Sequence, residues 1–378
     1  MVVENPFVYG QSVLGDAFTD RRREIDYLFH ELQSSARIFL ISPRRYGKSS
    51  LLQVVKQKLV QDGLLVAYVD LYKIASMNQF ADAYASAILN AADTKIERAI
   101  KAVLEMLVRL RPKIAIESTG VASVTLDYSF QSKETWQELE EVYQLPERIA
   151  RKKGTRFVVM LDEFQEASII GGDVLEKQLR AVVQTHTEVS YVFAGSKRHL
   201  LYEMVHDEKR PFYRMGEIFN LGKIPESEMA DFVLDRFSRT GYKVELSTVE
   251  QIINKMRNIP YNVQLLCHRL WAQTRDRKVI TDEDVALAIR SLVYTYEAIF
   301  GELWDNLTVY QKRLLRAIAL SKGRNLFSSE VIVRYGLETS SSVSKGLSLL
   351  QKKNLIERHD DHYEFNDIFF ERWILERG

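Results

Sequence analysis

The chain has 378 residues, with 52 lysines and arginines against 51 aspartates and glutamates and a net charge of +1. This length is enough for roughly two or three domains. The near-neutral charge gives no whole-chain basic signal, so any contact with nucleic acid must come from a local patch. Cys267 is the only cysteine, which excludes intrachain disulfides and cysteine-rich zinc clusters. No window approaches the roughly 18 apolar residues of a membrane span, and the N-terminal segment lacks a signal-peptide pattern, so we expect a cytoplasmic protein with no membrane partner.

The first predicted elements are a strand, a loop and a helix within the segment RIFLISPRRYGKSSLL. A mostly apolar run from Arg37 to Ile41 predicts the strand, and a helical pattern begins at Ser49. The spacing follows the phosphate-loop motif G-x-x-x-x-G-K-[ST], with Ser42 in place of the first glycine. An ordinary strand–turn–helix is the alternative, but the context on both sides of G-K-S favours a nucleotide site.

This motif also indicates how ATP and Mg²⁺ would be bound. Backbone N–H groups of the loop and the N-terminus of the helix can surround a phosphate. Gly47 lets the backbone approach closely, Lys48 can reach the β- and γ-phosphates, and the Ser49 hydroxyl can bind Mg²⁺. The residues expected at the phosphates are Ser42, Pro43, Arg44, Arg45, Tyr46, Gly47, Lys48, Ser49 and Ser50.

Two features follow the first helix. The run LLVAYVDL, residues 64–71, reads as the next strand. Residues 93–130 then interrupt the core: a helical pattern extends to Arg111, and KIAIESTGVASVTLDYS predicts a hairpin. We interpret this insert as a sheet extension or a packing flap and assign it no function.

The run FVVMLDE, residues 157–163, predicts a buried strand that ends in two acids. Asp162 would hold Mg²⁺ through water, and Glu163 would polarise the attacking water. The alternative is a buried strand that ends in a solvated acidic turn. The upstream phosphate loop favours the catalytic interpretation, because the two motifs together make a metal–phosphate site.

A further strand, SYVFAGS, covers residues 190–196. Strands that alternate with helical patterns imply a parallel sheet, so the predicted fold class is α/β with a P-loop NTPase core. Ligands of such sheets bind at the carboxyl ends of the strands, which would place Ser196 near the γ-phosphate as a sensor. A serine that merely ends a strand in a turn is the alternative. The glutamate directly after Asp162 suggests the branch of P-loop ATPases (ASCE type) with an extra strand between the two motif strands.

Beyond Leu221 the sequence becomes helical. Thr281 and Asp284 resemble a capping pair before the last of four helical segments. We interpret these segments as a small helical lid that closes over a nucleotide. Apolar spacing of three and four marks residues 226–239, 247–257, 261–275 and 281–299.

The C-terminal part predicts a winged helix-turn-helix. Thr308 caps a first helix, a short helix follows, and a third runs over about 340–353. The run LIERHDDHYEFND then predicts a two-stranded wing. The predicted boundaries are 1–221 for the P-loop domain, 222–300 for the helical lid and 301–378 for the winged helix.

The third helix of this C-terminal part is the candidate for contact with duplex DNA. It is rich in serine and lysine, which suit phosphate and base-edge contacts. A solvated helix face is the alternative, since no Arg, Asn or Gln precedes Gln351 in this helix. The candidate residues are Ser340, Ser341, Ser342, Ser344, Lys345, Lys352 and Lys353.

Together these motifs resemble the archaeal-type ATPase family, within the STAND and AAA+-like P-loop ATPases, over nearly the whole length. SPRRYGKSSLL, LDEFQEA with Gln165, and the terminal winged helix are similar to motifs of that family. The resemblance implies that the segment from Phe18 to Arg21 lies near the adenine. It also implies that Pro260 abuts the nucleotide, as in a Gly-x-Pro lid motif. Asn258 stands where that motif has glycine, and asparagine tolerates left-handed backbone geometry.

The segment KRPFYRMGEIFNL is similar to the stretch that carries an arginine finger in related ATPases. The candidates are Arg210 and Arg214. An arginine finger stabilises charge on the transferred γ-phosphoryl group, often from a neighbouring subunit. Surface arginines near a strand end are the alternative.

We therefore expect a switch that binds and hydrolyses ATP with Mg²⁺ and whose nucleotide state moves the winged helix. Two outputs stay open. In the first, the winged helix binds duplex DNA through residues 340–353 and the ATPase regulates that binding. In the second, the winged helix is a protein-interaction or autoinhibitory module of a signalling switch. A homo-oligomer is compatible with either.

Overall fold

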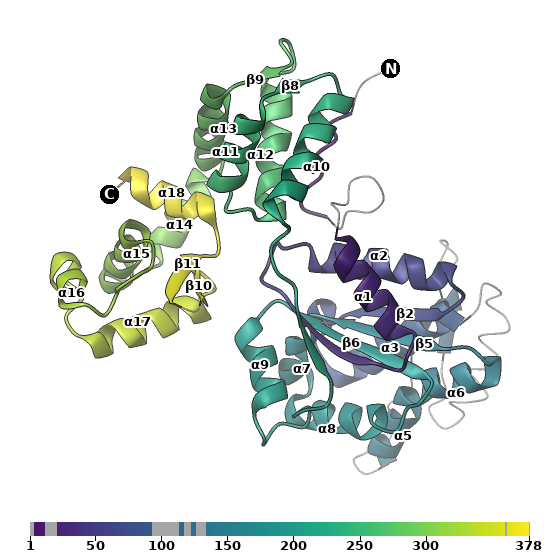
Figure 1. The fold of residues 1–378 in the computed structure, drawn as a ribbon. Helices are drawn as coiled ribbons and strands as arrows, with labels where there is room; N and C mark the ends of the chain where they lie inside the picture. Colours follow the sequence, from purple (N-terminus) through teal and green to yellow (C-terminus); the bar gives the residue numbers. More distant parts are fainter. Residues whose placement is uncertain are drawn as a thin grey trace. The chain divides into compact units, whose positions relative to one another are not determined.

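The computed structural model describes residues 4–11, 21–92, 113–116, 122–125, 134–359 and 361–377. The chain divides into two compact units, drawn in Figure 1: Tyr9–Pro225, and Met1–Val8 together with Glu226–Gly378. In the part of the chain that the structure describes, no helix is both long and apolar enough to cross a membrane.

The first unit contains a five-stranded sheet with the strand order β2-β5-β6-β1-β7. Each pair of neighbouring strands is parallel, which confirms the α/β fold class. β6 lies between β1 and β5, so the extra strand expected between the two motif strands is present. The strands are β1 (Arg37–Ile41), β2 (Leu65–Asp70), β5 (Phe157–Asp162), β6 (Val189–Gly195) and β7 (Glu217–Asn220).

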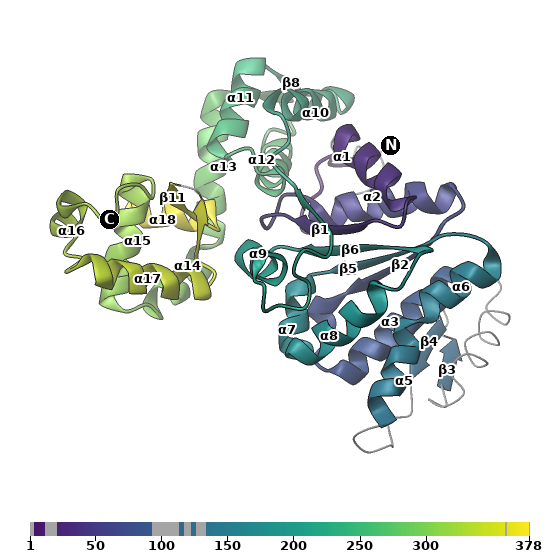
Figure 2. The ribbon, with the colours of Figure 1, turned by 60° about the horizontal axis from the view of Figure 1, so that its bottom comes forward.

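Helices cover both faces of this sheet (Figures 1 and 2), because alternate residues of a buried strand point to opposite sides. Leu40 and Val158 pack against α1 (Arg22–Leu32) and α2 (Lys48–Gln61) on one face. Phe39 belongs to the larger core on the other face. That core is covered by α3 (Met77–Ala92), α5 (Glu134–Tyr143), α6 (Leu145–Lys153), α7 (Ala167–Ile170), α8 (Gly172–Val183) and α9 (Arg198–His206).

The described part of the insert is a hairpin that packs on α3. β3 (Lys113–Ile116) and β4 (Ala122–Thr125) pair antiparallel, which confirms the predicted hairpin. The backbone N–H of Val124 donates to Ser86 Oγ on α3 at 2.8 Å, and the Val124 side chain joins the core. The helical pattern predicted from Ala92 to Arg111 lies, beyond Ala92, outside the described residues.

The second unit begins with a bundle of helices. Thr281 and Asp284 form a complete capping box at the start of its last helix, as predicted. The single helix expected over 281–299 is instead two, because Tyr296 leaves the helical conformation (φ −98°, ψ 6°) and α14 (Glu297–Asp305) starts after it. The bundle consists of α10 (Glu226–Arg239), α11 (Leu246–Lys255), α12 (Pro260–Gln273) and α13 (Asp282–Thr295), with short parallel strands β8 (Lys243–Val244) and β9 (Val279–Ile280).

The N-terminal segment packs on this bundle, although the sequence pattern groups it with the P-loop domain at 1–221. Asn5 Nδ2 donates to the His268 carbonyl at 3.0 Å, and the backbone N–H of Val8 donates to Gln264 Oε1 at 3.0 Å. The ring of Phe7 lies 4.6 Å from that of Phe237. Phe7 is buried there, and this apolar contact explains why the segment belongs to the second unit.

The C-terminal part has the predicted order of three helices and a wing. Thr308 caps the first helix with a complete capping box. Gly323, at φ 69°, lets the chain after that helix touch the wing, since a Cβ there would collide with the Tyr363 carbonyl. The elements are α15 (Val309–Ser321), α16 (Ser329–Tyr335), α17 (Ser340–Lys352), the antiparallel wing β10 (Ile356–His359) and β11 (His362–Phe365), and a last helix α18 (Ile368–Arg377).

Candidate nucleotide-binding site

The motif residues meet at one edge of the sheet. β1 and β6 are paired so that Ile41 lies opposite Gly195, at the carboxyl end of each strand. β5, the neighbour of β6, ends at Asp162 on the same edge. The loop after β1, the acids at the end of β5 and Ser196 after β6 therefore converge, as expected for a ligand site of a parallel sheet.

The loop between β1 and α2 has the backbone geometry that its motif predicts. Gly47 has φ 86° and precedes α2, in a left-handed conformation that glycine adopts without steric cost. α2 begins at Lys48, one residue earlier than the pattern indicates. Ser42 is fully buried, and its backbone N–H donates to the Gly195 carbonyl at 3.1 Å. Its φ is not positive, so this position does not require the glycine of the motif.

Arg21 ties the segment before α1 to this loop. Its guanidinium donates to the Tyr46 carbonyl at 2.9 Å and to the Gly222 carbonyl at 3.0 Å, and only 2% of the residue is exposed. Phe18 lies outside the described residues, so its place near an adenine stays a prediction. The remaining loop positions differ in exposure: Arg44 and Arg45 are exposed, Pro43 and Ser49 are half-buried, and Tyr46 and Ser50 are buried.

The ammonium group of Lys48 lies between the carboxylates of Asp162 and Glu163. Its ammonium donates to Asp162 Oδ1 and to Glu163 Oε1, the latter at 3.0 Å. Lys48 is 6% exposed and Asp162 is 2% exposed. Such buried pairs add little to stability, because desolvation offsets their attraction. This arrangement is therefore better explained by binding or catalysis than by folding.

Asp162 is also held by two hydroxyl groups. Its Oδ2 accepts hydrogen bonds from Ser49 Oγ at 2.9 Å and from Tyr68 Oη at 2.7 Å. Burial, together with the charge of Asp162, raises the pKa of Tyr68, so its hydroxyl remains a donor. Tyr68 comes from β2, which pairs with β5.

Glu163 is fixed by side chains from two further segments. Its Oε2 accepts from Gln165 Nε2 at 2.5 Å and from Ser196 Oγ at 2.8 Å. Burial raises the pKa of this carboxyl, but the charge of Lys48 and the hydrogen bonds from Gln165, Ser196 and Lys48 outweigh burial and lower it. Glu163 is therefore ionised at neutral pH and can accept a proton or a hydrogen bond.

The donor set fits Mg²⁺. Ser49 and Asp162 offer oxygen atoms only, the ligands that Mg²⁺ prefers. In the described ranges, no group of three or more His, Cys, Asp or Glu side chains could hold a metal ion. Mg²⁺ usually takes one or two protein carboxylates and completes its shell with phosphates and water. Ser49 and Asp162 are therefore the residues that could hold it with a bound nucleotide.

The two arginine-finger candidates lie in the segment between α9 and β7. β7 starts at Glu217, which pairs with Ile38 near the start of β1, so Arg214, just before β7, lies at the edge where these strands begin. The phosphate loop follows the end of β1, and the two edges are about 13 Å or more apart at about 3.3 Å per residue. Arg214 therefore lies away from the phosphate loop of its own chain, whereas the guanidinium of Arg210 contacts Asp173 and Glu176 of α8.

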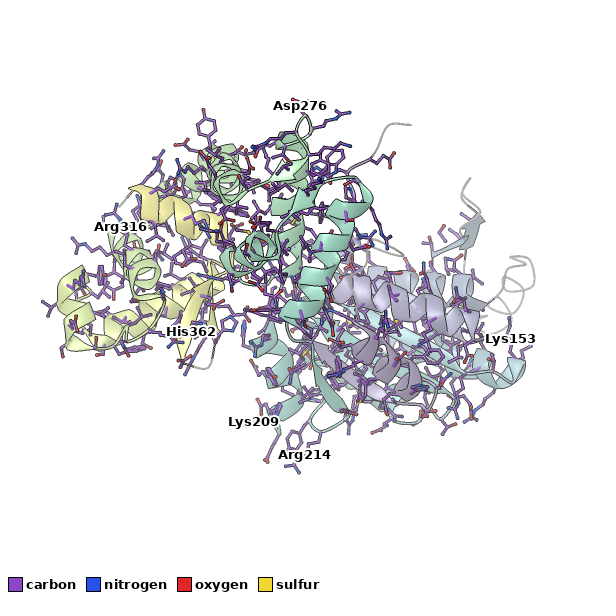
Figure 3. The ribbon with its side chains drawn as sticks, turned by 45° about the horizontal axis from the view of Figure 1, so that its top comes forward. Lys153, Lys209, Arg214, Asp276, Arg316 and His362 are labelled. Atoms are coloured by element: carbon purple, nitrogen blue, oxygen red, sulfur yellow. The ribbon has the colours of Figure 1, made fainter. Side chains whose placement is uncertain are left out.

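These two arginines also differ from each other. Arg210 Nη2 contacts Glu176 Oε1 on α8 at 2.6 Å, and Glu176 is fully buried. Arg214 is exposed, has φ 50°, and points away from the unit in Figure 3. Arg210 is thus engaged within its own unit, whereas Arg214 is available to another molecule.

Pro260 belongs to the second unit, where it is the first residue of α12. Asn258 has φ 52° and Arg257 has φ 55°, so the turn before Pro260 has the left-handed geometry that asparagine tolerates. The contact of Pro260 with a nucleotide stays a prediction.

The candidate DNA helix α17 presents a polar surface. Its inward face packs closely on α15, since a Cβ at Gly346 would touch Leu314 and Tyr310. Ser342 is half-buried, and Thr339 caps the helix by accepting from the Ser342 backbone N–H. The exposed positions include Ser340, Ser341, Ser344, Lys345, Lys352 and Lys353.

Sequence reasoning missed Tyr68 and the contact that Gln165 makes. Tyr68 is an ordinary strand residue, and only the pairing of β2 with β5 reveals that its hydroxyl reaches Asp162. Gln165 belongs to a quoted motif, but its hydrogen bond depends on the turn after β5, where Glu163 has φ 52°. A left-handed glutamate has no clear sequence signature.

Comparison with known proteins agrees with this geometry. Residues 18–266 match the family described as ATPase domain predominantly from Archaea, and residues 298–376 match a probable winged helix domain. No curated protein sequence matches the chain significantly.

Solved structures share the fold over nearly the whole length. The Walker-type ATPase paby2304 of Pyrococcus abyssi superposes with a TM-score of 0.66 at 17% identity, over 95% of this chain and 97% of that one. The ORC2 protein of Aeropyrum pernix, in its ADPNP–ADP complexes, has a TM-score of 0.55 at 15% identity over 94% of both chains. The ORC1 protein of Aeropyrum pernix in complex with DNA has a TM-score of 0.50 at 15% identity, over 96% of this chain and 94% of that one.

Proposed function

Because the chain belongs to the family of ATPase domains found predominantly in Archaea, we propose that it is a molecular switch in which ATP binding and hydrolysis control the C-terminal winged helix. The observation that carries this proposal is the meeting of Lys48 and Ser49 with Asp162 and Glu163 at one edge of the sheet. A cation, a hydroxyl and two carboxylates from segments far apart in sequence are the groups that phosphoryl transfer needs.

Each residue has a role in this proposal. Lys48 binds the β- and γ-phosphates, and Ser49 with Asp162 holds Mg²⁺. Glu163 orients a water molecule by accepting its hydrogen bond, and Ser196 lies beside Glu163 to respond to the γ-phosphate. When bound, MgATP would supply the phosphoryl group, and its Mg²⁺ would neutralise part of the charge on the phosphates. Since Lys48 contacts both acids, its position links nucleotide binding to the orientation of Glu163.

Contacts inside the second unit support a mechanical link to the winged helix. Arg257, in the turn before Pro260, donates to the buried Glu371 of α18, and its guanidinium lies 3.9 Å from Glu364 of β11. Arg372 of α18 donates back to the Lys255 carbonyl at 2.9 Å. If Pro260 contacts the nucleotide, as the resemblance implies, the turn that carries it is already bonded to the winged helix.

Aromatic packing strengthens the same connection. The ring of Tyr296, the residue directly after α13, lies 6.4 Å from the ring of Phe369 on α18. We therefore propose that the helical bundle and the winged helix move together as one lid, rather than as two independent parts.

Duplex DNA is the partner that we propose for the winged helix. α17 presents exposed serine and lysine side chains, which suit phosphate contacts. The related fold of the Aeropyrum pernix ORC1 protein was solved in complex with DNA.

A protein-interaction module is the second candidate, and the charge distribution favours it. Basic and acidic residues are nearly equal in number over 301–378. Exposed apolar side chains also occur there, at Leu320, Phe327 and Val333. These features suit a protein surface better than a phosphate backbone.

The rate of ATP hydrolysis, measured with and without duplex DNA at low salt, tests the proposal. A rate that changes with DNA, together with salt-dependent binding, supports the first output. A nucleotide-dependent change in oligomeric state without DNA affinity supports the second. A purified chain that neither binds nor hydrolyses ATP would contradict the switch itself.

A further inference from the structure

We propose that Gln165 is a positioning residue for ATP hydrolysis, whose side-chain amide fixes the direction of the Glu163 carboxylate. The inference rests on the proposed role of Glu163 in orienting water. Gln165 itself would touch neither the nucleotide nor the water; it would act through Glu163.

The contact is short and buried. Gln165 lies in a short 3₁₀ helix, Phe164–Glu166, directly after Glu163, and 1% of the residue is exposed. Its Nε2 donates to Glu163 Oε2 at 2.5 Å. Ser196 Oγ donates to the same oxygen, while Lys48 contacts Oε1. Both carboxylate oxygens are thus held, and Gln165 supplies the donor that shares the turn with Glu163.

The backbone at Glu163 explains why such a restraint is needed. Glu163 has φ 52° and ψ 42°, a left-handed conformation that costs a non-glycine residue about 1 kcal/mol or more. Glu163 thus departs from the extended backbone of β5, which ends one residue earlier at Asp162. Because the backbone conformation at Glu163 is unfavourable, its carboxylate needs hydrogen-bond partners in fixed positions to keep one orientation.

Gly195 makes room for the amide and sets its orientation. A Cβ at position 195 would collide with Gln165 Oε1, so the end of β6 must be small for Gln165 to lie there. The amide oxygen faces this glycine, which leaves the amide nitrogen facing the carboxylate. Among the described residues, Glu163 is the only hydrogen-bond partner of the Gln165 side-chain amide, because Oε1 has none.

The test uses the full chain with Gln165→Met, which keeps the length of the side chain and removes its donor. We expect kcat to fall roughly 10- to 100-fold, as for other misplaced catalytic groups, while KM for MgATP and the affinity for a non-hydrolysable analogue stay within about twofold. Gln178→Met is the matched control: Gln178 lies in the same unit, and within the described structure neither atom of its amide has a hydrogen-bond partner. It should behave as the wild type.

A second measurement separates positioning from a structural role. Introduced into a Glu163→Gln background, Gln165→Met should change the residual rate by less than about twofold, because its effect passes through the missing carboxylate. An unchanged kcat in Gln165→Met would overturn the proposal. So would loss of nucleotide binding, loss of folding, or an equal fractional effect in both backgrounds. Full activity of Glu163→Gln alone would instead contradict the role of Glu163, and with it the function proposed for the site.

Discussion

The Ser49 hydroxyl donates a hydrogen bond of 2.9 Å to Asp162 Oδ2, although the two residues are 113 positions apart in the chain. Ser49 lies in the first turn of α2, and Asp162 is the last residue of β5. Two segments that carry separate motifs therefore place their oxygen atoms side by side, in the arrangement that Mg²⁺ and a phosphate need.

Lys48→Ala should strongly weaken ATP binding. Lys48 lies within the site and can reach the phosphates, and loss of one partner of a buried charge pair costs about 2–5 kcal/mol. We expect the Kd for MgATP to rise at least about 30-fold, as measured by titration with a fluorescent analogue. Lys177→Ala, at an exposed lysine of α8, is the control and should bind as the wild type. Unchanged affinity in Lys48→Ala would mean that the nucleotide binds elsewhere.

Arg214→Ala should lower turnover without weakening ATP binding, if Arg214 acts on the site of a neighbouring copy. The exposure of Arg214 and its place at the far edge of the sheet allow a finger only in trans. A fall in kcat of roughly 1,000-fold or more is typical of a lost arginine finger. Mixing Arg214→Ala with Glu163→Gln should restore activity, because each copy supplies what the other lacks. The hypothesis fails if the wild-type specific activity is independent of protein concentration and Arg214→Ala is fully active.

Glu176 should make the stability of the first unit depend on pH. Burial raises the pKa of Glu176 to about 7, against an ordinary value of 4.5, although Arg210 opposes this. The folded state therefore holds the proton more tightly than the unfolded state, and the free energy of unfolding should fall as pH rises from about 4.5 to about 7.

Glu176→Gln should remove this contribution. We expect the pH dependence of the urea midpoint, measured at pH 5 and pH 8, to become flatter than in the wild type. Glu140→Gln, at an exposed glutamate of α5, should keep the wild-type dependence. Identical pH dependence in all three proteins would show that Glu176 titrates normally.

Lys345→Glu should weaken binding of duplex DNA by the full-length protein. Lys345 is exposed on α17, where a phosphate contact would be made. A lost phosphate contact weakens all sequences similarly and reduces the salt slope by about 1. Lys243→Glu makes the same charge change on β8 and should leave binding unaltered. Equal affinities of the two variants, or no DNA binding at low salt with ATP present, would favour the protein-interaction alternative.

The elements with strong local patterns could be predicted from the sequence alone. The strand at Arg37–Ile41, the acids at Asp162 and Glu163, and the capping pair at Thr281 could all be read from residue type and spacing. Parallel pairing then followed from the alternation of strands and helices, which placed the motifs at one edge of a sheet.

The remaining features depend on tertiary contacts that spacing does not encode. Tyr68 reaches Asp162 only through the pairing of β2 with β5. Phe7 binds to a bundle more than 200 residues away in sequence, as the contact of Val8 with Gln264 shows with a separation of 256. The sequence around Arg210 resembled that of an arginine finger, yet its side chain pairs with Glu176 on α8. A single sequence holds no signal for such pairs.

Comparison of ATP binding and ATP hydrolysis in Glu163→Gln tests the central claim most directly. Glutamine keeps the size of the side chain and removes only the carboxylate that is held by Lys48, Gln165 and Ser196. We expect MgATP affinity to stay within about threefold of the wild type, while single-turnover hydrolysis falls by roughly 100- to 10,000-fold. Hydrolysis at the wild-type rate in Glu163→Gln would contradict the account.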